Sequence, residues 1–74
     1  MASRYEKMVD TLESNYEAAP YERCEVREGK FTEILTDTGA LIGSKELNQH
    51  EIDHLLFLLN RYEARLNNLF HTGS

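Results

Sequence analysis

The stretch LNQHEIDHLLFLLNRYEARLNNLF, residues 47–70, decides how the rest of the chain folds. Its apolar residues recur in alternating steps of three and four, which is the spacing of one helical stripe. The members of this stripe are Ile52, Leu55, Leu59, Tyr62, Leu66 and Leu69. Asn48 and Glu51 form a capping-box pattern, so the sequence predicts that one long helix begins there. At ~1.5 Å per residue the helix would be roughly 33 Å long, and we expect it to be the spine of the fold.

A second helix is predicted at the start of the chain. Ser3 followed by Glu6 is another capping box, and the helix it opens is expected to run to about Ala18. Pro20 ends this helix, because proline has no backbone N–H and restricts the residue before it. Its buried stripe is expected to be Tyr5, Met8, Val9, Leu12 and Tyr16.

Between these helices the sequence pattern favours three short strands. The strands are predicted at residues 21–27, 31–36 and 40–42, separated by a turn at Glu28-Gly29 and a hairpin loop at Asp37-Thr38-Gly39. A two-residue first loop would put Phe31 and Leu35 on the face of Cys24 and Val26, and a three-residue loop would put Thr32 and Ile34 there instead. The predicted fold class is therefore α+β. Residues 1–74 form a single domain of order α-β-β-β-α, with a three-stranded antiparallel sheet and two helices packed on one face.

Composition narrows the range of functions. The chain has 74 residues, 13 acidic against 8 basic side chains, and a formal net charge of −5. This charge disfavours nonspecific binding to nucleic acids or membranes. Cys24 is the single cysteine, so no internal disulfide forms and we expect a reducing, cytoplasmic setting. The longest apolar run, Leu55–Leu59, is far shorter than the ~20 residues of a membrane span.

The predicted element order also suggests an alternative function. Double-stranded-RNA-binding domains share the α-β-β-β-α order and approximate length, which makes a nucleic-acid-binding module the alternative. Those domains use a basic cluster before the last helix and a Gly-Pro-x-His loop between the first two strands. The corresponding stretches here, residues 44–49 and 27–30, read SKELNQ and REGK. Nucleic acid is therefore not the partner that we expect.

A zinc-hydrolase pattern is present at His50-Glu51-Ile52-Asp53-His54, which matches H-E-x-x-H. In metalloproteases two histidines one turn apart bind zinc, and the glutamate activates the metal-bound water. A minimal zinc-binding hydrolase is thus the second alternative, with Cys24, Glu33 or His71 as the third ligand. Because Glu51 already has a capping role and the chain is short, we expect no metal, no cofactor and no enzymatic activity.

Two surfaces are candidates for binding a partner. The first is an acidic stripe along the first helix, with carboxylates at steps of four, three and four: Glu6, Asp10, Glu13 and Glu17. The second is apolar. Strands of ~20 Å cannot cover a 33 Å helix, so we expect part of the last helix to protrude and pair with a second copy. The residues expected to form this homodimer are Phe57, Leu58, Tyr62, Leu66, Leu69 and Phe70.

The sequence therefore predicts a small non-enzymatic regulator or inhibitor that binds another protein. Phages and mobile elements encode proteins of this kind to occupy the functional surface of a host protein. The acidic stripe favours a partner with a basic surface, such as a nucleic-acid-binding protein whose groove the stripe would block. The alternative role for the same carboxylates is a solvated helix face without a partner.

Overall fold

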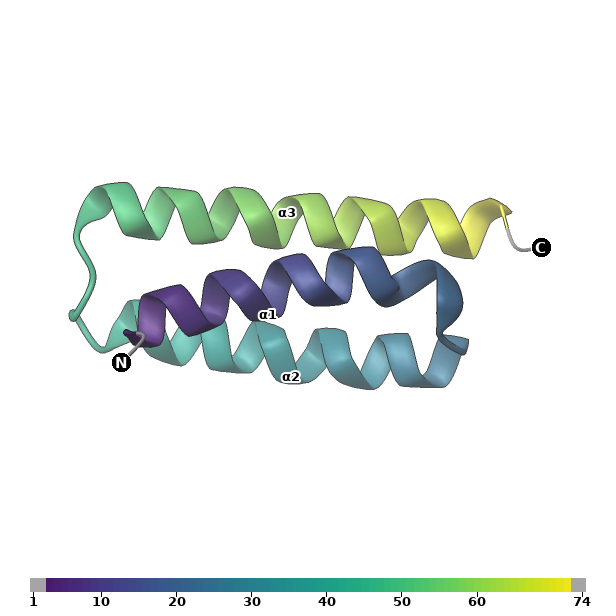
Figure 1. The fold of residues 1–74 in the computed structure, drawn as a ribbon, viewed down its shortest axis with the longest axis horizontal. Helices are drawn as coiled ribbons and strands as arrows, with labels where there is room; N and C mark the ends of the chain where they lie inside the picture. Colours follow the sequence, from purple (N-terminus) through teal and green to yellow (C-terminus); the bar gives the residue numbers. More distant parts are fainter. Residues whose placement is uncertain (1–2, 73–74) are drawn as a thin grey trace.

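Three α-helices run up, down and up along one long axis (Figure 1). The structure is a computed structural model that describes residues 3–72, with side chains up to residue 69. Helix α1 spans Arg4–Ala18, α2 spans Cys24–Gly43 and α3 spans Gln49–Thr72, and the short 3-10 helix η1 covers Ala19–Tyr21. The molecule measures 40 × 21 × 17 Å, so its length is close to that of α3.

The prediction of an α+β fold is wrong. Within residues 3–72 there is no strand, and almost all of the segment predicted as a sheet is helix α2. The physical reason is that the residues of the inward side recur at steps of three, four and three, which is the spacing of a helical stripe. The glycines in this segment suggested turns and so obscured that spacing. Along this stripe Ile34, Thr38 and Leu41 are buried and Phe31 is half-buried. The chain thus has one buried face per helix instead of a two-faced sheet.

The residues that suggested turns and strands are compatible with a helix. Gly29 and Gly39 have no positive φ, and an added Cβ at either position would meet nothing within 4 Å. Two threonines bond back along the helix: Thr32 Oγ1 donates to the carbonyl of Glu28, and Thr36 Oγ1 donates to the carbonyl of Thr32, both at 3.0 Å. These bonds satisfy the threonine hydroxyls within α2, although such bonding slightly destabilises a helix.

The helix boundaries predicted from capping residues are confirmed. Asn48 N–H donates to Glu51 Oε1 at 3.0 Å, and Glu51 N–H donates to Asn48 Oδ1 at 2.9 Å, which completes the capping box of α3. Ser3 Oγ accepts from the N–H of Glu6 at 3.1 Å and caps α1. Helix α1 ends at Ala18, and Pro20 lies in η1 directly after it.

The core lies between the three helices and is dominated by α3. Buried apolar residues come from α1 and η1 (Leu12, Ala19), from α2 (Ile34, Leu41) and from α3 (Leu55, Leu58, Leu59, Tyr62, Leu66). The ring of Phe31 on α2 meets the ring of Tyr62 edge-on, with centroids 5.7 Å apart. Since five of these nine residues belong to α3, the role of this helix as the spine is confirmed.

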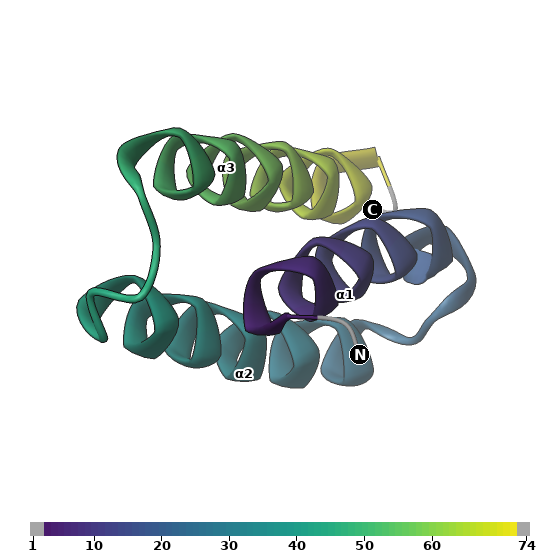
Figure 2. The same cartoon turned by 60° about the vertical axis from the view of Figure 1, so that its left-hand side comes forward.

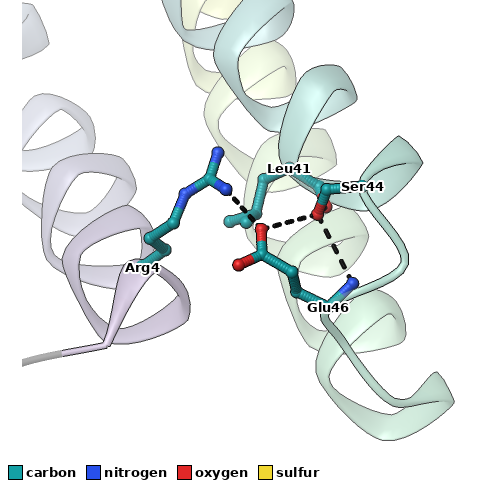
Figure 3. A network of polar contacts seen from close by, with 4 residues as sticks. All are labelled: Arg4, Leu41, Ser44 and Glu46. Atoms are coloured by element: carbon teal, nitrogen blue, oxygen red, sulfur yellow. Dashed lines mark hydrogen bonds and ion pairs between the residues drawn. The ribbon is translucent and has the colours of Figure 1, made fainter.

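Polar contacts fix the two connections of α2. Before α2, Arg27 Nε donates to the carbonyl oxygen of Glu22 at 2.9 Å, and the Glu22 carboxylate pairs with Lys30. After α2, Lys45 has a left-handed φ of 64°, and Ser44 Oγ donates to the carbonyl of Leu41 at 2.6 Å. Figure 3 shows how Glu46 then joins Ser44 Oγ, at 2.8 Å, to the guanidinium of Arg4 on α1.

Replacing Gly29 or Gly39 with alanine should stabilise the protein. Each substitution removes a glycine from an exposed helical position with room for a Cβ, so we expect a gain of about 0.5–1 kcal/mol. For a domain of this size that corresponds to an increase in Tm of roughly 2–8 °C, measured by circular dichroism. A lower Tm for Gly39→Ala would instead indicate that Gly39 has a left-handed φ, as the predicted hairpin loop required.

Candidate interaction surfaces

The acidic stripe predicted on the first helix lies at the surface of α1. Glu6, Asp10, Glu13 and Glu17 are all exposed, while Leu12 on the opposite side of α1 is buried in the core. Ser3 fixes where the helix begins, and the steps of four, three and four then keep the carboxylates in line. We call these four residues the acidic face.

Lys7 of α1 is exposed beside the acidic face, whereas four other basic side chains near α1 contact other groups. Arg4 pairs with Glu46, and Lys30 pairs with Glu22. On α3, the guanidinium carbons of Arg61 and Arg65 lie 4.0 and 4.4 Å from the ring centroid of Tyr16. These cation–π contacts join α3 to α1 beside the core. The acidic face consequently presents carboxylates to solvent, while much of the positive charge of the chain is used between helices.

The H-E-x-x-H segment forms the first turns of α3. His50 is exposed, Glu51 is committed to the capping box, and Nδ1 of His54 is 2.5 Å from the hydroxyl of Tyr5 on α1. Of the third ligands that the sequence offered, Cys24 and Glu33 belong to α2, and Cys24 begins that helix at the end of the molecule away from α3's start (Figure 1). His71 lies outside the described side chains. Within the described residues no three His, Cys, Asp or Glu side chains form a group that could hold a metal ion.

Zinc should be dispensable for folding. Because Glu51 caps α3 and His54 contacts Tyr5, the pattern is explained by structural roles, and we predict that a chelator leaves the Tm unchanged. Elemental analysis of the purified protein, with thermal melts before and after chelation, checks this. Stoichiometric zinc whose removal lowers the Tm by many degrees would contradict the prediction.

The apolar residues predicted to join two copies lie mostly inside the molecule. Leu58, Tyr62 and Leu66 are buried, and Leu69 is half-buried against the core. Phe57 is 61 % exposed, and the side chain of Phe70 lies outside those described. The expected surface is missing because α2 is a helix of 20 residues, about 30 Å long, and covers more of α3 than ~20 Å strands would. The homodimer stays a prediction, with Phe57 as its exposed member.

Mutations at the buried and at the exposed positions of this set should therefore have different effects on stability. Leu66→Ala removes a buried core side chain and should cost about 2–5 kcal/mol of unfolding free energy. Phe57→Ser changes an exposed side chain and should alter stability by no more than about 0.5 kcal/mol. Urea unfolding measures both. Equal and small changes in the unfolding free energy of the two variants would show that Leu66 is at the surface of the single chain, as the dimer prediction required.

Sequence reasoning also missed two buried polar groups, the carboxylate of Glu22 directly after η1 and the phenol of Tyr62 on α3. Burial and the nearby carboxylate of Glu22 raise the pKa of the Tyr62 phenol. Among the described residues, neither Tyr62 Oη nor Glu22 Oε1 has a hydrogen-bond partner. The phenol is protonated at neutral pH with or without this shift, so the raised pKa does not change its charge there.

A groove between α1 and α2 could accept only a small ligand. Its volume is about 270 Å³, and its lining residues are Arg4, Lys7, Met8, Thr11, Asp37, Ala40 and Leu41. Sites for drug-sized ligands usually measure ~300–1,000 Å³ and are enclosed. The lining contains no histidine or cysteine to act as a base or nucleophile. Its ionisable lining residues are Arg4, Lys7 and Asp37.

Apart from Phe57, part of the exposed apolar surface was not predicted. Leu35 on α2 and Leu56 on α3 are 47 % and 42 % exposed. The strand prediction assigned Leu35 to a face buried in the sheet, and the stripe of the last helix did not include Leu56. A helical wheel drawn over residues 24–43 would have placed Leu35 at the margin of the buried face.

No helix within residues 3–72 combines the length and apolar character needed to cross a membrane. Comparison of the chain with protein-family models, with curated proteins and with solved structures found no match. Function is therefore inferred from the surfaces of the chain itself.

Proposed function

We propose that the chain is a small non-enzymatic regulator or inhibitor that binds the basic surface of another protein through the acidic face of α1. The observation that carries this proposal is the exposure of all four carboxylates on one side of a helix whose other side is buried. A helix fixed on its buried side holds its charges in a constant arrangement, which lowers the entropic cost of binding.

The spacing of the acidic face supports a basic groove as its target. Neighbouring carboxylates three or four residues apart have Cβ atoms ~5–6 Å apart, so they repel one another and gain from a shared cationic partner. A row of negative charges on this scale is comparable to a nucleic-acid backbone, which favours a nucleic-acid-binding protein as the partner. Such a partner would be attracted over long distances, because exposed charges act mainly on the association rate.

The setting that we propose is the cytoplasm, and the class is that of small inhibitors encoded by phages or mobile elements. The lone Cys24 is exposed and has no disulfide partner in the chain, which suits a reducing compartment. The alternative of a nucleic-acid-binding module rested on the α-β-β-β-α order, and the three-helix fold removes that basis.

Neutralising the acidic face should weaken binding without unfolding the protein. The variant changes Glu6, Glu13 and Glu17 to glutamine and Asp10 to asparagine, all at exposed helical positions. We expect its affinity for a fluorescent ten-residue oligolysine probe to fall by about tenfold at low salt, and the salt dependence of binding to weaken. Fluorescence polarisation measures the affinity, and circular dichroism verifies the fold.

A matched control distinguishes a loss of affinity caused by the acidic face from one caused by the change in net charge. Neutralising four exposed acids elsewhere, Glu25, Glu33, Asp37 and Glu63, changes the net charge by the same amount. This control should retain most of the affinity for oligolysine. An equal loss in both variants would mean that the acidic face is an ordinary solvated surface. Once a partner has been captured from the source cells, the same pair of variants tests it directly.

A further inference from the structure

The two margins of the buried stripe on α3 differ in character. One margin faces α1, since His54 contacts Tyr5 and Arg61 lies over Tyr16. Leu56 lies on the opposite margin. It follows the buried Leu55 by one residue and is therefore rotated by ~100° from Leu55, in the direction away from α1. Ile52, one turn before Leu56, shares this margin and is half-buried.

Helix α2 shows the same division. Asp37 and Ala40 line the groove with α1, so they mark the margin that faces α1. Leu35 and Ile42 are seven residues apart on the other margin, where Leu35 is 47 % exposed and Ile42 is half-buried. Gly39 lies between them in the sequence and is exposed. Because glycine has no side chain, it adds no bulk to the helix surface at this point.

These two apolar margins meet along the junction of α2 and α3. The helices are antiparallel, and the contact of Phe31 with Tyr62 fixes their register. By helix geometry, this register places Leu35 at about the level of Leu56 along the helix axes, and Ile42 at about the level of Ile52. Figure 2 shows α1 on one side of the α2–α3 pair, with no helix of the described chain on the other side. We call Leu35, Ile42, Ile52 and Leu56 the α2–α3 seam.

The charged residues that α2 and α3 place beside the seam have one sign, whereas exposed Lys45 lies in the connection between the two helices. Glu28, Asp53 and Glu63 are exposed and lie on the same sides of α2 and α3 as the seam. The four basic residues of α2 and α3 are engaged elsewhere. Arg27 and Lys30 bond to Glu22, and Arg61 and Arg65 lie over Tyr16. The seam is therefore an apolar strip with an acidic rim.

We propose that the α2–α3 seam is a docking site for a basic amphipathic helix of another protein. An apolar strip along two neighbouring helices suits recognition of an amphipathic helix, whose residues at i, i+3 or i+4, and i+7 would lie along the strip. Lysine or arginine residues flanking that stripe would reach the carboxylates of Glu28, Asp53 and Glu63. The site is separate from the acidic face, so it gives the protein a second binding surface.

Charge argues against a second copy as the occupant. A copy docked through its own seam would bring the same three carboxylates against these three, and the chain carries a net charge of −5. Like charges opposed across an interface disfavour association. A basic helix meets the same rim with the opposite sign, and its apolar residues bury Leu35 and Leu56.

A defined peptide tests the proposal. The probe is a fluorescein-labelled 14-residue peptide of leucine and lysine, with leucines at helical spacing, and its counterpart carries glutamate in place of lysine. We expect the lysine peptide to bind and to shift the methyl NMR signals of Leu35, Ile42, Ile52 and Leu56. The glutamate peptide should not bind. Shifts confined to other methyl groups, or equal binding of the two peptides, would overturn the proposal.

Variants separate apolar docking from charge attraction. Leu35→Gln with Leu56→Gln should weaken binding of the lysine peptide by about tenfold. The matched control, Tyr21→Gln with Phe57→Gln, changes two exposed aromatics outside the seam and should weaken binding less than twofold. Circular dichroism establishes that both remain folded. If the control lost as much affinity as the seam variant, the peptide would be binding to exposed apolar residues in general.

The rim is tested in the same way. Neutralising Glu28, Asp53 and Glu63 should weaken binding of the lysine peptide several-fold, whereas neutralising the exposed acids Glu25, Glu33 and Asp37, which belong neither to the seam rim nor to the acidic face, should have little effect. Equal losses would show attraction to net charge alone and would overturn the assignment. Light scattering of the protein without peptide decides between occupants: a dimer that Leu35→Gln dissociates would identify a second copy in the seam, against the proposal.

Discussion

Coverage of the apolar stripe on α3 is the constraint that the rest of the structure satisfies. This helix has 24 residues, about 36 Å at 1.5 Å per residue, and Leu55 and Tyr62 within it are fully buried. A neighbour must be almost as long to shield the stripe, and an antiparallel helix of 20 residues meets that condition. Helix α1 covers the other side of the stripe through Leu12 and Tyr16. The need for length thus favours helix over sheet for residues 24–43.

The parts of the fold that sequence reasoning predicted are those with local causes. Ser3 and Asn48 cap helices through bonds to residues three positions away, and Pro20 acts on its immediate neighbours. Helix α2 could not be predicted in this way, because Gly29 and Gly39 signal turns locally while its helical state depends on packing against α3. The four acidic residues lie in line at the surface because α1 forms as predicted, and their role in binding stays a prediction. The apolar surface was misplaced, since a short sheet was assumed to leave the end of α3 exposed.

The distribution of charge connects the two proposed surfaces. Arg4, Arg27 and Lys30 bond to groups of the connecting segments, while Arg61 and Arg65 lie against Tyr16. Positive charge is thereby concentrated between elements, where it joins them. Carboxylates dominate the outer sides of all three helices, both along α1 and around the α2–α3 seam. Lys7, Arg23 and Lys45 are exposed as well, so the exterior carries both signs with an excess of negative charge, and both surfaces favour cationic partners.

The weakness of α2 as an isolated helix has a consequence for how the molecule moves. Two interior glycines and a start at Arg23, whose side chain makes no capping bond, leave α2 dependent on its contacts with α1 and α3. Its amide hydrogens should therefore exchange with solvent through sub-global opening, at a lower free energy than those of α3. A ligand bound at the seam would slow this exchange, because it would contact α2 and α3 together and so hold α2 in its packed position.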